Sequence, residues 1–199
     1  MFGAEVTEPS SPDLALSPPE RLAVLYAPRA CQPLWEGFLL LDRRLADAAR
    51  EGRDPLMIQL RLAWWRDRFA TPSADWPQGE PLLALLRAWE SERAALLGLV
   101  DGWEARVVGD DGGAELGKAR IAAVCALARM SGAQPDDAVR CAAAEWLGLE
   151  PPAPRASILP GALRPLVILR GMALREAARR PGGPLRDFLA ILRLGLLGR

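Results

Sequence analysis

The chain has 199 residues, enough for one domain with a sizeable core, and half of these residues are hydrophobic. Lys and Arg together number 25, as do Asp and Glu, so the formal net charge is zero, which argues against a nucleic-acid partner bound through a broad basic face. The chain lacks histidine, the commonest general base and zinc ligand near neutral pH, and its three cysteines show no CxxC spacing. This composition predicts a cytoplasmic protein with neither a disulfide framework nor a zinc site, and no apolar run is long enough to span a bilayer.

In chain order, the predicted elements are helices separated by Pro and Gly, with no strand-like alternation. Residues 1–15 are predicted to be a disordered tail, and residues 16–199 one helical domain. The first helix is expected to begin at the capping box of Ser17 and Glu20, and the second to cover about 33–51. The third begins at the capping residue Asp54 and extends to about residue 70. Further helices are expected near 81–108 in one or two pieces, 114–130, 135–149, 161–180 and 184–197.

The third helix contains two apolar stripes at helical spacing, one formed by Leu56, Leu60 and Trp64, the other by Ile58, Leu62, Trp65 and Phe69. Two stripes predict that most of the helix circumference is buried. Arg61 lies one turn from Trp65, where it could stack on the indole or bind an anion beside it. The alternative is a core helix whose arginines pair with nearby acidic residues.

Magnesium binding or general-acid chemistry requires carboxylates on one face. Asp47 and Glu51 are four residues apart and are predicted to share a helix face, whereas Asp42 points elsewhere. Solvated surface charge is the simpler interpretation of such a pair. Asp101 lies beside Gly102 and Trp103 in another predicted helix, where close packing or a bound ligand would explain the glycine.

Several segments occur in an order that resembles the squalene and phytoene synthase family. They are 25–27 (LYA), 38–47 (FLLLDRRLAD), 54–56 (DPL), 61–66 (RLAWWR), 99–103 (LVDGW), 155–160 (RASILP) and the closing 198–199 (GR). The resemblance is closest to a short bacterial branch that includes relatives of a mitochondrial complex I assembly factor. It implies an all-α bundle of the isoprenoid synthase type around a central apolar cavity.

Active members of this family join two isoprenoid diphosphates head to head, using Mg²⁺ held by two Asp-rich motifs. The first motif would fall at residues 42–50, where only Asp42 and Asp47 remain and Arg50 takes an acidic position. The second would fall at 142–150, where its aspartates are missing, and residues 114–130 lack the tyrosine of the active enzymes. Without both carboxylate clusters, most of the leaving-group stabilisation would be lost.

The resemblance therefore predicts a non-catalytic relative that binds an isoprenoid or other lipid-like ligand, or a protein partner in an assembly role. A retained cavity would be lined by five residues, namely Arg61, Trp64, Trp65, Trp103 and Arg155.

The alternative is a prenyltransferase with a reduced magnesium site. Its catalytic candidates are Asp42, Asp47 and Asp101, and its metal candidates are Asp47 and Glu51, with Glu145 or Glu150 and Arg61 as further members.

A third hypothesis gives residues 184–199 a peripheral contact with the inner membrane, since Phe188, Leu189, Leu192 and Leu196 can share one side of a helix. The competing interpretation is a terminal helix packed on the bundle.

Overall fold

All regular secondary structure in the described part of the chain is helical, which confirms the predicted all-α class. The computed structural model describes residues 15–109, 111–153, 158–178 and 184–197, and for 184–188 and 196–197 the course of the helix alone. The predicted tail therefore lies outside the described residues, apart from Ala15. The α-helices are α1 Pro18–Leu25, α2 Gln32–Ala48, α3 Pro55–Ala70, α4 Pro81–Leu86, α5 Arg93–Val108, α6 Ala114–Met130, α7 Asp137–Trp146, α8 Arg164–Ala177 and α9 Pro184–Leu197. Short 3₁₀ turns are η2 Arg29–Cys31, η3 Ser73–Asp75, η4 Arg87–Glu92 and η5 Gly161–Leu163.

The helix starts follow the local signals in the sequence. Glu20 accepts a hydrogen bond from the main-chain N–H of Ser17 at 2.7 Å, so the predicted reciprocal contact at the start of α1 is present. Asp54 accepts from the N–H of Leu56 at 2.8 Å and caps α3. These contacts satisfy N–H groups that have no partner within the helix, which explains why both starts could be predicted.

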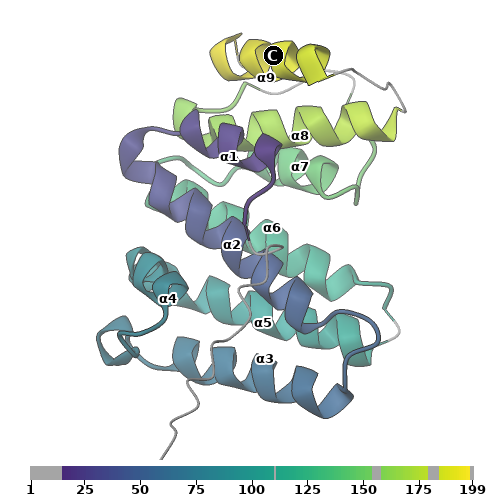
Figure 1. The fold of residues 1–199 in the computed structure, drawn as a ribbon. Helices are drawn as coiled ribbons and strands as arrows, with labels where there is room; N and C mark the ends of the chain where they lie inside the picture. Colours follow the sequence, from purple (N-terminus) through teal and green to yellow (C-terminus); the bar gives the residue numbers. More distant parts are fainter. Residues whose placement is uncertain (1–14, 110, 154–157, 179–183, 198–199) are drawn as a thin grey trace, which may run out of the picture.

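The helices form a stack in which neighbours in the sequence are mostly neighbours in space (Figure 1). At one end α3 packs on α5, and α5 packs on α6. Then α6 packs on α7, and α7 packs on α8, which also contacts α1 and α9 at the other end. Helix α2 runs obliquely through the middle and contacts α1, α4 and α5. Consequently α3 and α9 are the outermost helices of the described stack.

Aromatic rings occupy the centre of this stack. The ring of Phe38 lies 6.5 Å from that of Trp35, 6.3 Å from that of Trp89 and 6.2 Å from that of Trp146, measured between centroids. The indole N–H groups of Trp35 and Trp89 donate to main-chain carbonyls, so these buried polar groups are satisfied. The rings of Trp35, Phe38 and Trp89 belong to one cluster of buried apolar side chains that extends along the chain from residue 16 to residue 194, and the partly buried Trp146 packs against it.

Gly102 allows the close packing of α5 on α6. A Cβ atom at this position would lie 2.9 Å from the Cβ of Ala119 and 3.0 Å from the Cα of Leu116. Helix packing therefore accounts for this glycine.

None of the helices in the described ranges is both long enough and apolar enough to cross a membrane.

Candidate functional site

Asp42 on α2 is held by side chains from two other helices. Arg120 on α6 donates to its carboxylate from Nε at 3.0 Å and from a terminal nitrogen at 2.9 Å. The indole of Trp103 on α5 donates to the same carboxylate at 2.9 Å, and the Arg120 guanidinium lies 5.1 Å from the centroid of the Trp103 ring. Arg120, a residue of the chain itself, thus supplies the positive charge that pairs with Asp42, a candidate catalytic residue.

Asp47 lies at the end of α2 and binds two arginines, Arg50 at 2.7 Å and Arg53 at 2.8 Å. The prediction that Asp47 and Glu51 share a helix face is wrong, because α2 ends at Ala48 and Glu51 lies in the following turn, exposed. The chain reverses there through Gly52, whose φ of 81° is in the left-handed region that favours glycine. Arg50 pairs with Asp47 from three residues further along, and Arg53, which follows Gly52, pairs with it as well.

Asp101 on α5 pairs with Arg66 of the tryptophan helix, α3. Arg66 donates to Asp101 at 2.8 Å and also binds Glu104 one turn later. Hydrogen bonds to Asp101 and then to Glu104 raise the pKa of the Arg66 guanidinium. The two carboxylates therefore fasten α3 to α5.

Glu145 on α7 is the one charged side chain that is fully buried among the described residues. It forms an ion pair with Arg170 on α8 and accepts the N–H of Ala153 at 3.0 Å, so the charge is compensated. Glu150 is exposed beyond the end of α7. The pair joins α7 and α8 to the connector between them.

The residues proposed for a magnesium site do not fit a shared metal cluster. Asp42, Asp47, Asp101 and Glu145 each bind their own arginines, as described above. Within the described part of the chain, no three His, Cys, Asp or Glu side chains are grouped so that they could hold a metal ion. A site for several Mg²⁺ ions needs carboxylates from different helices to converge, and these point to separate arginines.

The tryptophan helix buries one of its two apolar stripes. Ile58, Leu62, Trp65 and Phe69 are buried against the neighbouring helices, as expected. The expectation that the second stripe is also buried is wrong. Its exposed fractions are 67% for Leu56, 55% for Leu60 and 38% for Trp64, and the adjacent Met57 is 47% exposed. We call these four residues the α3 face.

Arg61 does not form the predicted stack with Trp65. Arg61 is exposed, whereas Trp65 is buried and stacks on Phe69 with centroids 5.5 Å apart. The guanidinium that lies over a ring of this helix belongs to Arg68, 5.8 Å from the centroid of Trp64.

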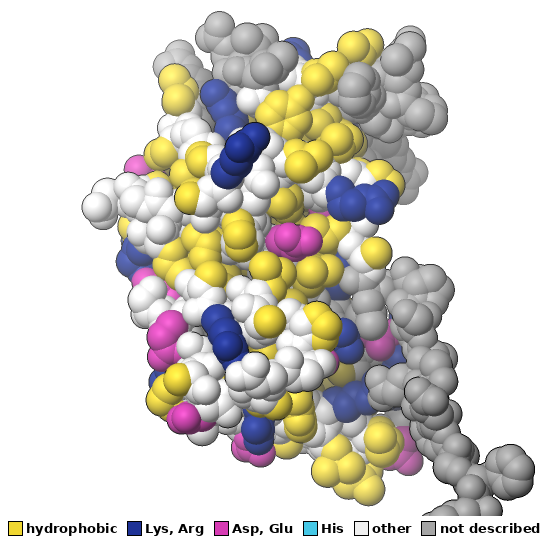
Figure 2. Space-filling model, turned by 60° about the vertical axis from the view of Figure 1, so that its left-hand side comes forward, with side chains coloured by type: hydrophobic (Ala, Val, Ile, Leu, Met, Phe, Trp, Pro, Cys, Tyr) yellow, Lys and Arg dark blue, Asp and Glu magenta, His cyan; other side chains and the backbone are white. Residues whose placement is uncertain are grey.

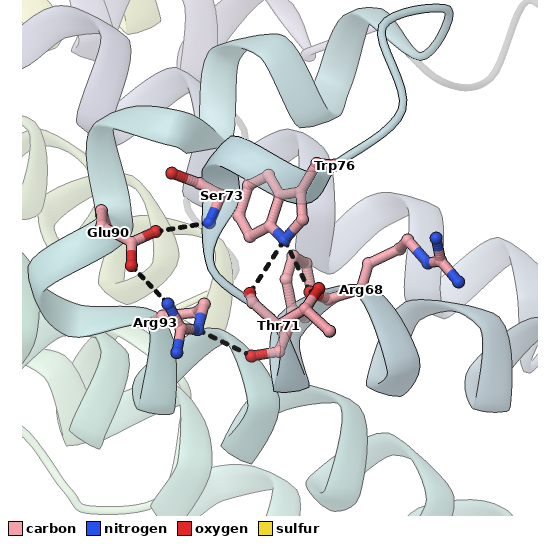
Figure 3. A network of polar contacts seen from close by, with 7 residues as sticks. Arg68, Thr71, Ser73, Trp76, Glu90 and Arg93 are labelled. Carbon is pink, nitrogen blue, oxygen red and sulfur yellow. Dashed lines mark hydrogen bonds and ion pairs between the residues drawn. The ribbon is translucent and has the colours of Figure 1, made fainter.

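The C-terminal end of α3 is fixed by a polar network (Figure 3). The indole of Trp76 donates to the carbonyl of Arg68 at 2.6 Å and to that of Thr71 at 3.1 Å. Arg93, at the start of α5, donates to the carbonyl of Phe69 at 2.9 Å. These donors bind main-chain carbonyl groups at the C-terminal end of the helix, where the helix itself supplies fewer partners.

Glu90 completes this network on the side of η4. Its carboxylate accepts the N–H of Ser73 at 2.8 Å and pairs with Arg93 (Figure 3). Hydrogen bonding by Ser73, and then the charge of Arg93, lowers the pKa of the Glu90 carboxyl. The α3 face is therefore presented by a helix anchored at its end.

The residues predicted to line one cavity lie in different environments. Trp103 binds Asp42, Trp65 lies in the core beside Phe69, and Arg61 and Trp64 are exposed on α3. The fifth, Arg155, lies outside the described residues.

Helix α9 packs on α8 and α1 through the buried Ile191 and Leu194, as the competing interpretation of residues 184–199 predicts. Leu189 is 54% exposed, and Leu192 is partly buried. The side chains of Phe188 and Leu196 lie outside the described residues.

Sequence reasoning missed the exposed α3 face and the arginine partners of Asp42 and Asp47. It did offer a helix whose arginines pair with nearby acidic residues, and Arg66 on α3 pairs with Asp101 and Glu104. Both stripes of α3 have the same spacing, so periodicity alone does not say which one faces solvent. Asp42 and Arg120 are 78 residues apart, and no local signal connects them.

Comparison of the chain with protein-family models, curated proteins and solved structures found no match. The squalene and phytoene synthase resemblance therefore remains a proposal based on the sequence segments quoted above.

Proposed function

We propose that this protein is a non-catalytic relative of the squalene and phytoene synthases that acts as an interaction or assembly protein. The observation that carries the proposal is the arginine pairing of Asp42, which uses both carboxylate oxygens. Asp47 also pairs through both oxygens, with two arginines, whereas Asp101 and Glu145 each bind an arginine through one oxygen. The proposal places the protein in the cytoplasm, with membrane contact at most peripheral.

The chemistry of diphosphate ionisation explains why this pairing argues against transferase activity. The leaving group is stabilised by Mg²⁺ ions that bridge its oxygens and are held by carboxylates. At Asp42, metal binding would require the carboxylate to lose two charge-assisted bonds to Arg120 and one hydrogen bond from Trp103. Asp47 would have to release two guanidinium groups.

The α3 face supports binding to a protein in preference to a lipid held inside the bundle. Exposed apolar residues grouped on one element mark interaction sites. Trp, Met and Arg, all present on or beside this face, are enriched in protein interfaces. By contrast, the centre of the described stack contains the packed rings of Trp35, Phe38, Trp89 and Trp146.

The direct test is incubation of the purified protein with farnesyl or geranylgeranyl diphosphate and Mg²⁺. Pyrophosphate release and lipid products would be measured by a coupled assay and mass spectrometry. We expect no product above a buffer control. Magnesium-dependent formation of a head-to-head product would overturn the proposal, and loss of that product in an Asp47→Ala, Asp101→Ala double variant would establish the transferase alternative.

A further inference from the structure

The α3 face gathers much of the exposed apolar surface on one helix. Nine large hydrophobic side chains are exposed among the described residues, and four of them are Leu56, Met57, Leu60 and Trp64. The other five are distributed over other parts of the chain. Figure 2 draws one face of the molecule, on which hydrophobic side chains lie among charged ones.

The apolar area of the α3 face is comparable to one side of a protein interface. The four exposed fractions, 67, 47, 55 and 38%, average about one half. For side chains of roughly 200 Å² each, this gives on the order of 400 Å² of exposed apolar area. One partner in a standard interface contributes about 800 Å², of which slightly more than half, about 450 Å², is apolar.

The charged residues beside the α3 face favour a protein as the binding partner over an anionic membrane. Arg61 and Asp67 are exposed on α3, and Arg68 lies over Trp64, so both signs of charge border the apolar residues. The whole chain has a formal net charge of zero, so two copies approach one another without net repulsion. A surface of mixed charge lacks the basic cluster by which proteins bind anionic lipids.

The position and spacing of α3 suit contact between two identical helices. Leu56, Leu60 and Trp64 follow one another at intervals of four residues and form a single ridge along the helix. Ridges of this spacing on two helices interdigitate in the commonest class of helix packing. Helix α3 is an outermost helix of the described stack (Figure 1), and Leu56, Leu60 and Trp64 are exposed on it.

We propose that a second copy of this chain docks on the α3 face and forms a two-fold symmetric dimer in which the α3 helices pack against each other. A symmetric contact uses the same patch on both copies, so one face supplies both sides of the interface. The inference rests on the proposed binding role of the protein and names the partner. Leu60, between Leu56 and Trp64, lies near the middle of the contact.

Sedimentation equilibrium of the full chain over a concentration series tests the inference. We expect the mass to rise from 21.6 kDa toward twice that value. Leu60→Glu should weaken the dimer by about 30-fold or more, because it removes a central apolar contact and places two carboxylates near the symmetry axis. The matched control is Leu25→Glu on α1, where the leucine has a similar exposed fraction of 65%. This control should dimerise like the original chain, and circular dichroism should show both variants folded.

A chain that is monomeric at every concentration would overturn the inference, and so would a dimer that Leu60→Glu leaves unchanged. A monomer that sediments with phosphatidylglycerol–phosphatidylethanolamine vesicles, and loses this binding in Leu60→Glu, would assign the face to a lipid surface instead. Neither result depends on the prenyl-transfer assay. Failure of the dimer is therefore distinguishable from failure of the non-catalytic proposal.

Discussion

The outermost helices, α3 and α9, end the described stack in different ways (Figure 1). Helix α9 contacts α8 and α1, and its Gly195 lies directly against the ring of Tyr26. Helix α3 packs mainly on α5, to which it is bonded by Arg66 through Asp101 and Glu104. Both helices bury apolar side chains, but α3 has a second apolar stripe, which is exposed.

The difference shows that the two end helices of one stack can be held in place in different ways. Glycines let α9 lie close to two neighbours, because Gly195 leaves room for the Tyr26 ring and Gly171 of α8 leaves room for the Leu194 side chain. Side-chain contacts alone hold α3, on its inner side and at its C-terminal end, and its outer side is left accessible. The anchoring of a helix thus explains how an exposed apolar stripe can persist on a stable protein.

The largest expected effect is a difference in the free energy of unfolding between substitutions in the buried and the exposed stripe of α3. Trp65→Ala removes a buried ring that stacks on Phe69 and should reduce the free energy of unfolding by about 3–5 kcal/mol. Trp64→Ala, one residue away and 38% exposed, should change it by about 1 kcal/mol or less. Urea unfolding followed by circular dichroism measures both values. Equal losses in the two variants would contradict the assignment of an inner and an outer stripe.

A similar loss is expected beneath α9, where Arg170 of α8 compensates the buried Glu145. Arg170→Met would leave a carboxylate buried without its cation and should reduce the free energy of unfolding by about 3–5 kcal/mol. Arg140→Met is the matched control, since Arg140 pairs with the exposed Asp137 at 3.6 Å, and it should have an effect of about 0.5 kcal/mol or less. Urea unfolding measures both, and indistinguishable midpoints would refute the structural role of the buried pair.

A loss of stability of intermediate size is expected at Gly195 and not at Gly98. A Cβ atom at Gly195 would collide with the Tyr26 ring, so Gly195→Ala should destabilise the docking of α9 by about 1–3 kcal/mol. Gly98→Ala in α5 adds a Cβ atom with nothing within 4 Å and should stabilise the protein by about 0.5–1 kcal/mol. Hydrogen exchange should locate the first change in α9. Unchanged exchange of α9 amides in Gly195→Ala would show that this contact does not hold the helix.

The smallest effect is a pH dependence at the C-terminal end of α3. The pKa of Glu90 is lowered from its ordinary value of 4.5 by hydrogen bonding from Ser73, so its ionised form is favoured in the folded state. Its stabilising contribution is therefore complete above about pH 4.5 and is lost as the pH falls through the lowered folded-state pKa. NMR titration of the Ser73 amide should show this loss, and Glu90→Gln should remove the step. An unchanged titration in the variant would assign the step to another group.

The sequence by itself determined the helices and most of their ends. Caps such as Ser17 and Asp54 act within one turn, and hydrophobic periodicity is a local property, so α3 and α6 were predicted to within a residue. Helix α2 was predicted too long: it ends at Ala48, and after the turn at Gly52 Arg53 joins Arg50 on Asp47. The helix propensity of the residues after Ala48 is weaker than the ion pairs that these residues form when the helix ends there.

Only the tertiary structure decided which stripe of α3 is buried and what each candidate carboxylate binds. Asp42 acquires Arg120 and Trp103 because α2, α5 and α6 meet, and spacing within α2 contains no information about that meeting. Likewise, the exposure of Leu60 depends on α5 covering one side of α3 and not the other. Packing between distant segments determines both the burial of a helix face and the partner of a charge.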